Sequence, residues 1–219
     1  MLNKIIFVIS ILYSIIYNIR IIGFNNGLKC PILFKIGTKI SIKGQIQIKG
    51  NIVPYMIKIG FGGSEGIYAH KSYFIIKEQG ILTFNGKAHF SEGTTIRVEN
   101  GRLSFGNNFF CNKNCAFFCD HKIEIKDDVL LGWNITFKDG DGHKIINTDF
   151  PSDKTTEPSI TINKHVWIAS HANILKETEI ASDSIVAYQA CVTKKFKSPN
   201  CLIGGIPAHV IKENIKWEI

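Results

Sequence analysis

A histidine that follows two aspartates is the residue of this chain best suited to chemistry. His143 ends the segment KDGDGH, in which Asp139 and Asp141 precede it by four and two residues. An imidazole has a pKa near neutrality, so it can take a proton from a hydroxyl group and make that oxygen a nucleophile. Either aspartate could accept a hydrogen bond from the other ring nitrogen and fix its tautomer. The segment therefore predicts His143 as a general base, with Asp141 or Asp139 as its partner.

This histidine lies in the longest interruption of a repetitive chain. Residues 138–159 are rich in Asp, Gly, Thr and Pro, a composition typical of a loop, and His143 is the only histidine among them. Long loops on rigid scaffolds commonly carry functional residues. Without such a scaffold the same segment would be interpreted as an ordinary surface turn, so the prediction depends on the elements around it.

A six-residue repeat predicts that scaffold. From residue 162 onwards every sixth residue is aliphatic, and the residue four positions further on is small or short. The aliphatic positions are Ile162, Ile168, Ile174, Ile180, Val186 and Val192, and the short ones are Val166, Ala172, Thr178, Ser184 and Ala190. A period of six fits short strands joined by tight turns, each strand forming one side of a prism. We therefore predict an all-β chain folded as a parallel β-helix.

The repeat also extends upstream of the loop. The frame continues back to Phe84, with slips at 98–104 and 118–124 that we interpret as small corner insertions. Residues 25–80 are strand-like but follow the frame less well, as a capping region would. The predicted organisation is an N-terminal helix at 1–24, a β-helix domain at 25–212 and a C-terminal tail at 213–219.

Composition restricts the class of partner. The 219 residues are 45% hydrophobic and 20% charged, which excludes a disordered tail or a collagen-like fibre. Lys and Arg exceed Asp and Glu by eight, so the surface should attract anions such as phosphates, acidic glycans or lipid headgroups. Since no compact basic stripe with interleaved aromatic residues is visible, we do not expect a nucleic-acid partner.

The six cysteines are expected to be free thiols. Their spacing does not indicate a disulfide framework, which favours a reducing, cytoplasmic location. Cys111, Cys115 and Cys119 are evenly spaced by four residues, which matches neither zinc ribbons nor ferredoxins. In the hexad frame Cys111 and Cys115 both point inward, so we expect small buried side chains and no metal.

The N-terminus contains an apolar segment with two interpretations. Residues 5–17 are almost wholly apolar and end before Asn18 and Arg20, whereas a spanning helix needs about 20 apolar residues. No small-residue cleavage site of a signal peptide follows. The first interpretation is a helix on the membrane surface, with residues 1–22 holding a cytoplasmic protein at the inner face of the membrane. The second is a packed cap on the domain.

Three segments resemble the hexapeptide-repeat acyltransferases, and the resemblance covers roughly residues 55–212. WNITFKDGDGH (133–143) is similar to the Asp-x-Asp-x-His segment of polysaccharide O-acetyltransferases of that family. SITINKHVWIASHANILKETEIASDSIVAYQACVTKKF (159–196) and IGGIPAHVIK (203–212) are similar to its repeats and its closing motif. The resemblance implies a left-handed β-helix and the transfer of acetyl from acetyl-CoA to a sugar hydroxyl, in surface-polysaccharide biosynthesis of the capsule type.

The same resemblance implies a homotrimer with acetyl-CoA bound between coils of neighbouring subunits. The backbone at Ala169 and Ala187 would then contact the pantetheine, and Trp133 and Asn134 would border the sugar. The nucleotide end would meet Thr193, Lys194 and Lys195. Ala169 stands where the family usually has Gly, Tyr188 and Gln189 replace a common Gly-Ala pair, and His209 replaces a Lys or Arg; the first two changes would narrow the groove for the cofactor.

Three other functions remain open from the sequence. One is acetyl transfer to a small acceptor, such as an antibiotic or an amino sugar. Another is a zinc enzyme of the γ-carbonic-anhydrase type, because His165 and His171 occupy equivalent positions in successive hexads, although no third ligand is visible. The last is a non-catalytic β-helix that binds a glycan.

Overall fold

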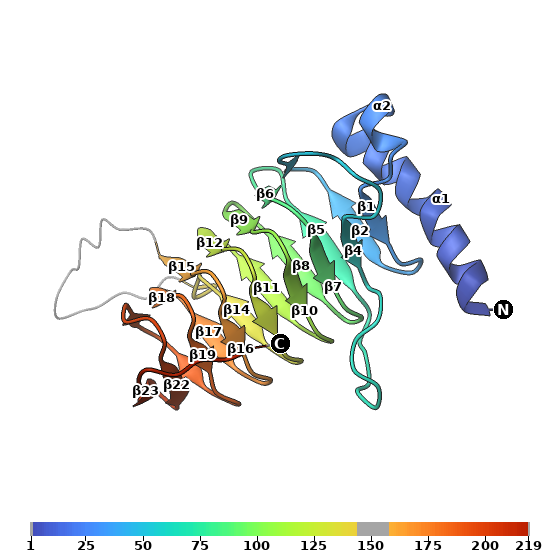
Figure 1. Cartoon of the computed structure of the whole chain (residues 1–219). Coiled ribbons are helices and arrows are strands. Elements are labelled where there is room, and N and C mark those ends of the chain that lie inside the picture. Colours follow the sequence, from blue (N-terminus) through green and yellow to red (C-terminus); the bar gives the residue numbers. More distant parts are fainter. Residues whose placement is uncertain (1, 144–157, 219) are drawn as a thin grey trace.

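Short strands follow one another around a three-sided prism in the computed structural model, which describes residues 2–143 and 158–218 (Figure 1). Each strand pairs in parallel with the strand one coil further along, so the three sides of the prism are three sheets, which we name A, B and C. The predicted parallel β-helix is confirmed. Parallel pairing satisfies the backbone of every inner coil from the coils on both sides.

The strands occur in the order A, B, C in each coil. Sheet A contains β1 (Ile32–Phe34), β4 (Ile57–Ile59), β7 (Ala88–Phe90), β10 (Phe109–Cys111), β13 (Leu130–Leu131), β16 (Trp167–Ile168), β19 (Ile185–Val186), β22 (Leu202–Gly205) and the antiparallel β23 (Ala208–Lys212). Sheet B contains β2 (Lys39–Ile42), β5 (Tyr73–Ile76), β8 (Thr95–Val98), β11 (Ala116–Cys119), β14 (Thr136–Lys138), β17 (Asn173–Leu175) and β20 (Cys191–Val192). Sheet C contains β3 (Gln45–Ile48), β6 (Ile81–Phe84), β9 (Arg102–Phe105), β12 (Lys122–Ile125), β15 (Ser159–Ile162), β18 (Thr178–Ile180) and β21 (Lys195–Phe196).

The hexad frame describes the core as predicted. The aliphatic positions from Ile162 to Val192 are fully buried, and the short residues four positions further on are buried at the corners. Cys111 and Cys115 are buried as well. A row of phenylalanines continues the core upstream, in which Phe117 and Phe137 of successive coils stack with ring centroids 5.0 Å apart.

The corners explain why two histidines recur in the frame. The residue before each short position has a left-handed backbone, and this set comprises His165, His171, Glu177, Asp183 and Gln189, with φ between 53° and 63°. A left-handed residue lets the chain turn sharply enough for the next residue to point inward. His165 and His171 therefore stand at equivalent positions because both belong to these turns.

The structure explains the slips of the hexad frame. Phe117 pairs with Ile96 and with Phe137, which lie 21 and 20 residues away along the chain, whereas Val192 pairs with Ile174, 18 residues before it. The coils that contain residues 98–104 and 118–124 are therefore three and two residues longer than a coil of three hexads, which confirms the predicted small insertions. Residues 25–80 contain β1 to β5 in parallel pairs with later strands, and the 13 residues between β4 and β5 interrupt the frame there.

The N-terminal helix α1 (Leu2–Ile22) lies against the free edge of β1 and is followed by the short α2 (Phe24–Gly27) (Figure 1). Its side chains at Ser10, Ser14 and Asn18 are fully buried. Ser10 Oγ accepts the Ile36 N–H at 2.9 Å and Ser14 Oγ accepts the Phe34 N–H at 2.8 Å. One face of α1 is thus packed as a cap on the first coil.

Asn18 completes this cap in the manner of a peptide group. Its Oδ1 accepts the Ile32 N–H at 3.1 Å, and its Nδ2 donates to the Ile32 carbonyl at 2.7 Å. Because Asn18 turns inward, the helix continues through Asn18 and Arg20 to Ile22. Within the described residues, Lys4–Ile22 is the one helix that is long and apolar enough to cross a membrane by length and composition alone, so the expectation that the apolar segment is too short was wrong.

The other end of the chain is also packed. The β22–β23 hairpin closes sheet A, and the tail returns along the prism. The Trp217 ring stacks on His165 with centroids 4.2 Å apart, and its Nε1 donates to the His165 carbonyl at 3.2 Å. The tail residues therefore belong to the folded unit.

Candidate active site

The predicted base lies where the chain leaves sheet B. β14 ends at Lys138, and the next residues turn outward at the corner between sheets B and C. Asp141 and His143 are exposed. The rest of the predicted loop, residues 144–157, lies outside the described residues.

Asp139 holds the root of this loop. Its carboxylate is fully buried and accepts the Asp120 N–H at 2.7 Å and the His121 N–H at 3.1 Å, both from the coil before. Burial raises the pKa of Asp139 above its ordinary value, and the two N–H donors oppose this shift. Since both oxygens face the backbone of that coil, the structure does not bring Asp139 to His143.

Asp141 is turned toward the opposite side of the loop. Its carboxylate forms an ion pair with Lys176 of the following coil, and its carbonyl lies 3.5 Å from Lys138 Nζ. Within the described residues, the His143 ring forms no hydrogen bond to either aspartate. The predicted pairing of His143 with Asp141 or Asp139 therefore stays a prediction.

A hollow of about 310 Å³ lies on the side of the loop toward the C-terminal coils. We call it the Thr193 hollow, and its lining residues are Lys138, Gly140, Asp141, Leu175, Lys176, Glu177 and Thr193. It brings the predicted catalytic residue Asp141 together with the predicted cofactor residue Thr193. Lys138 and Lys176 border it together with Asp141 and Glu177, so its lining carries both signs of charge.

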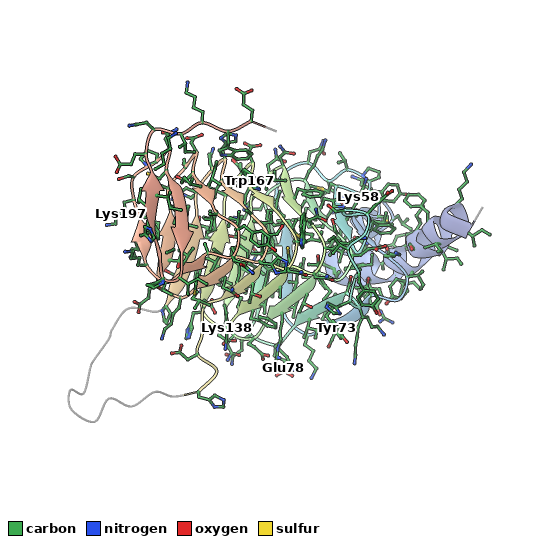
Figure 2. The ribbon with its side chains drawn as sticks, turned by 90° about the horizontal axis from the view of Figure 1, so that it is seen from below. Lys58, Tyr73, Glu78, Lys138, Trp167 and Lys197 are labelled. Carbon is green, nitrogen blue, oxygen red and sulfur yellow. The ribbon has the colours of Figure 1, made fainter. Side chains whose placement is uncertain are left out.

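A second hollow of about 460 Å³ lies on the other side of the loop. We call it the Phe118 hollow, and it is lined by Arg97, Glu99, Phe118, Asp120, Lys138 and Gly142. Arg97 and Glu99 form an ion pair beside the half-buried Phe118 ring. An aromatic face with several hydrogen-bonding groups suits a ligand with many hydroxyls. Lys138, labelled in Figure 2, borders both hollows, so the loop that carries His143 leaves sheet B between them.

Sequence reasoning missed the residues that connect these hollows. Arg97, Phe118, Lys138 and Leu175 pair in register across β8, β11, β14 and β17, and Thr193 continues this row. Each one directly follows an inward residue of the hexad frame, so each points outward from sheet B. The hexad frame could have identified them, because on each coil near the loop they occupy the position directly after the inward residue.

The remaining predicted residues fall at two corners of the prism. Thr193, Lys194 and Lys195 lie at the corner between sheets B and C, as the loop does; Lys194 Nζ lies 5.5 Å from the Phe196 ring centroid. Trp133, Asn134, Ala169 and Ala187 lie at the corner between sheets A and B. Lys138 is four positions after Asn134, which is about 13 Å of extended strand. One chain therefore does not bring the two groups together.

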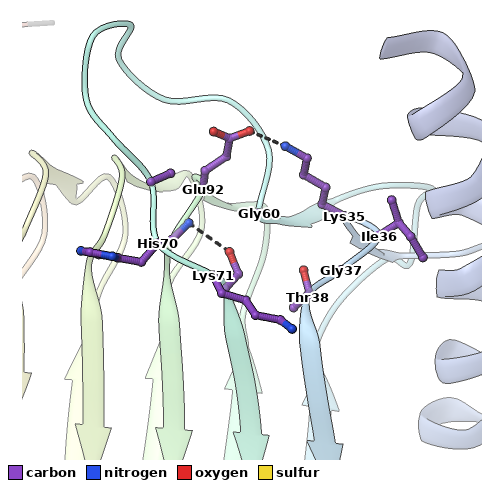
Figure 3. A pocket seen from close by; sticks show the side chains of 11 residues that line it. Lys35, Ile36, Gly37, Thr38, Gly60, His70, Lys71 and Glu92 are labelled. Atoms are coloured by element: carbon purple, nitrogen blue, oxygen red, sulfur yellow. Dashed lines mark hydrogen bonds and ion pairs between the residues drawn. The ribbon is translucent and has the colours of Figure 1, made fainter. Parts of the chain in front are cut away.

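Two features elsewhere carry none of the predicted site residues. His165 is hydrogen-bonded through Nδ1 to Asp183 at 2.8 Å, and within the described part of the chain no three potential ligands gather around a metal position. A hollow of about 230 Å³ near the N-terminal end contains Lys71 and the Lys35–Glu92 ion pair (Figure 3).

Known O-acetyltransferases are similar to the chain, although no protein-family model matches it. The chain is 31% identical over 125 residues to galactoside O-acetyltransferase of Escherichia coli (strain K12), which is 57% of each protein. It is 25% identical over 180 residues to an uncharacterized 24.8 kDa protein in the cps region of Klebsiella pneumoniae, covering 82% of this chain and 79% of that one. The crystal structure of the polySia-specific acetyltransferase NeuO matches with a TM-score of 0.65 at 18% identity, over 86% of this chain and 82% of that one.

These comparisons test the predicted fold and the resemblance to the hexapeptide-repeat acyltransferases. The likeness to NeuO confirms the left-handed parallel β-helix with its N-terminal helix. The likeness to galactoside O-acetyltransferase confirms the resemblance to the hexapeptide-repeat O-acetyltransferases. The chain spans little more than half the length of galactoside O-acetyltransferase in this match.

Proposed function

We propose that the chain is an O-acetyltransferase that transfers acetyl from acetyl-CoA to a sugar hydroxyl in surface-polysaccharide biosynthesis. One observation carries the proposal: the loop with the exposed His143 rises between two hollows that share Lys138. A transferase needs this arrangement, because donor and acceptor must approach one base from two sides. The names of the relatives, a galactoside O-acetyltransferase and a polySia-specific acetyltransferase, support a sugar as the acceptor.

In this mechanism His143 takes the proton of the sugar hydroxyl as the oxygen attacks the thioester carbonyl carbon. The bond from carbon to sulfur then breaks, and the imidazolium returns its proton to the leaving thiolate, which gives coenzyme A and the acetyl ester. Negative charge develops on the carbonyl oxygen, and a positioned donor lowers the energy of that state. Lys138 is our candidate, since it borders both hollows.

We assign the Thr193 hollow to the donor and the Phe118 hollow to the acceptor. Thr193, Lys194 and Lys195 supply hydroxyl and ammonium groups at the corner of sheets B and C, where phosphates of coenzyme A can be bound. Phe118, Arg97 and the acids near them supply an apolar face and hydrogen-bonding groups for a sugar ring.

We propose a homotrimer, in which two corners of the prism from neighbouring subunits form the site. Ala169, Ala187, Trp133 and Asn134 lie at a different corner from the loop, and none of them lines either hollow beside it. Around a threefold axis, however, the corner of sheets A and B of one subunit can face the corner of sheets B and C of its neighbour. We therefore expect a trimer with His143 near a subunit boundary.

Light scattering of the purified protein checks this assembly. We expect three times the mass of one 24.6 kDa chain. We also expect activity to fall on dilution if subunits separate, because the site would lose the residues of the neighbouring corner. A monomer with full activity would contradict the shared site.

Lys194→Ala tests the assignment of the donor side. A phosphate contact remote from the reacting atoms contributes equally to the ground state and the transition state, so we expect weaker acetyl-CoA binding with kcat largely kept. The loss expected for one exposed charge–phosphate contact is about five- to tenfold in KM for acetyl-CoA. Lys197→Ala serves as the control, because Lys197 is an exposed lysine directly after β21. A fall in kcat with unchanged KM would contradict this assignment.

The release of coenzyme A thiol in the presence of sugar acceptors tests the function itself. The panel contains monosaccharides, nucleotide sugars and surface polysaccharide, and mass spectrometry locates the acetyl group on oxygen or nitrogen. We expect transfer to a sugar oxygen. Binding of glycan without any use of acetyl-CoA would instead identify a non-catalytic β-helix. We further propose a cytoplasmic location, where acetyl-CoA is available, with residues 1–22 at the inner face of the membrane.

A further inference from the structure

We propose that the N-terminal cap, which comprises α1, α2 and the first coil β1–β3, binds the surface of an anionic phospholipid bilayer. The contact is made by the outward face of α1 and by basic residues around it. This inference concerns where the protein is held, and it does not depend on the proposed acetyl transfer.

The helix α1 has its polar stripe on the inside. Ser10, Ser14 and Asn18 are spaced by four residues, so they lie on one helix face, and that face is the one bonded to β1 and to Ile36 just after it. A helix on a soluble domain ordinarily turns its apolar stripe to the core and its polar face to water. Here the backbone edge of β1 takes up the polar residues, which leaves apolar residues for the opposite face.

That opposite face is exposed. Its residues keep large fractions of their surface open, namely Ile5 (50%), Val8 (55%), Ile9 (45%), Leu12 (63%) and Ile16 (54%). The apolar surface continues past the helix end through Phe24 (64%) and Leu28 (51%). Scattered apolar residues on a surface need no explanation, but a contiguous row over about three turns of helix indicates a binding surface.

The charge of the chain is concentrated at the same end. Residues 1–64 contain eight Lys and Arg and no Asp or Glu, and the rest of the chain contains 18 of each sign. The whole formal charge of +8 therefore comes from the segment that forms the cap and the coil after it. Lys35 and Lys43 are paired with Glu92 and Glu78 of later coils. The others form no ion pair with any residue that the structure describes: Lys4, Arg20, Lys29, Lys39, Lys49 and Lys58.

A hollow of about 600 Å³ lies beside α1 at the open end of the prism. Ile40, Ile42 and Ile46 of β2 and β3 contribute apolar side chains, and Tyr17 and Arg20 line it from the helix. It offers apolar walls with a guanidinium beside them. Such a hollow fits part of a lipid with an anionic headgroup, since Arg binds phosphate through two N–H groups.

Charge decides between a bilayer and a second copy of the chain. Two copies that met through this face would bring together two clusters of lysine and arginine, so repulsion opposes their association. An apolar helix face surrounded by basic residues is the pattern of helices that lie in a membrane interface. Anionic headgroups attract each Lys or Arg near the surface, and the apolar side chains enter the acyl region.

Flotation with vesicles tests this inference on the full chain. We expect binding to vesicles of phosphatidylcholine with phosphatidylglycerol, much weaker binding to phosphatidylcholine alone, and loss of the difference at high salt. The double variant Leu12→Gln, Ile16→Gln should weaken binding by about tenfold or more, because two apolar side chains no longer enter the acyl region. Neither residue contacts β1 through a hydrogen bond, so the fold should persist.

Charge variants separate the two contributions. Lys29→Gln with Lys39→Gln should weaken binding to the anionic vesicles by about tenfold or more, with little effect on the neutral ones. The matched controls are Tyr68→Gln, an exposed aromatic residue away from α1, and Lys197→Gln with Lys212→Gln at the opposite end of the prism. Both controls should bind as the unaltered chain does.

Three outcomes would overturn the inference. The first is that the full chain binds no vesicles, and the second is that it binds neutral and anionic vesicles equally. The third is that the Leu12→Gln, Ile16→Gln variant binds as the unaltered chain does while its circular dichroism spectrum is normal. A double variant that instead halves the mass in the absence of vesicles would show that the face joins copies of the chain. Acetyl transfer to a soluble acceptor, measured in parallel, reports on the proposed function separately.

Discussion

His143→Ala is expected to lower the rate of acetyl transfer by about a hundredfold to ten-thousandfold, the range typical for loss of a general base. Without the imidazole, the sugar hydroxyl keeps its proton while it attacks, so its oxygen is a poor nucleophile. The affinity for coenzyme A should change little, because the proposed contacts at Thr193, Lys194 and Lys195 lie on ordered coils beyond the loop. Steady-state kinetics with a sugar acceptor, together with calorimetric titration of coenzyme A, measures both quantities.

The two aspartates provide internal comparisons for this result. Asp139→Asn replaces a carboxylate oxygen by an NH₂ group that faces the N–H groups of Asp120 and His121, so it should lower stability as well as activity. Asp141→Asn removes the ion pair with Lys176 at an exposed position, so stability should be kept. A specific loss of kcat in Asp141→Asn would support its role as the partner of His143. Near-normal turnover in His143→Ala, with the fold intact, would refute the proposed mechanism.

Asn18→Leu is expected to destabilise the protein by about 2–5 kcal/mol. Leucine is branched at Cγ as asparagine is, but its two methyl groups replace Oδ1 and Nδ2 and leave the N–H and the carbonyl of Ile32 without their partners. Each buried backbone group that loses its hydrogen bond costs about 1–3 kcal/mol. Urea unfolding, followed by circular dichroism, measures the difference in the free energy of unfolding.

Ile16→Ala is the matched control for this prediction. Ile16 lies two residues before Asn18, on the outward face of α1, and is 54% exposed, so its truncation should change the free energy of unfolding by about 0.5 kcal/mol or less. An Asn18→Leu protein as stable as the control would mean that water takes over the bonds to Ile32. Removal of residues 1–22 is a poorer experiment than either variant, because it strips Ser10, Ser14 and Asn18 from the edge of β1 together.

The core could be predicted from the sequence because the hexad frame reports burial directly. Each side of the prism contributes one inward residue every six positions, so the period alone identifies Ile162, Phe137 and Cys111 as buried. The frame also contained the row from Arg97 to Thr193, one position after the inward residues. This row could not be recognised as a surface of the site from the sequence, because outward residues follow no regular chemical pattern. Only the stacking of the coils places them side by side.

Two other features depend on information that no local pattern carries. Asp139 has the same spacing to His143 as a catalytic partner would have, and only the path of the coil before it shows that Asp120 and His121 occupy its oxygens. Similarly, the apolar residues of α1 suggest a face for the core, as they would in most helices. The free edge of β1 reverses this orientation. Its unpaired backbone groups require hydrogen-bond partners, and the serines and Asn18 supply them where an isoleucine could not.

The stacking of the coils also fixes a length. The cap lies at β2, and the loop with His143 leaves β14, which is four strands further along sheet B. With neighbouring strands about 4.8 Å apart, this separation is about 19 Å. The prism thus holds the root of the loop about two nanometres from β2, and the width of α1 adds to its distance from any surface that the outward face of α1 touches. An acceptor tethered to that surface must extend across this gap, and each coil inserted between β2 and β14 would lengthen the required reach by one strand spacing without altering the chemistry.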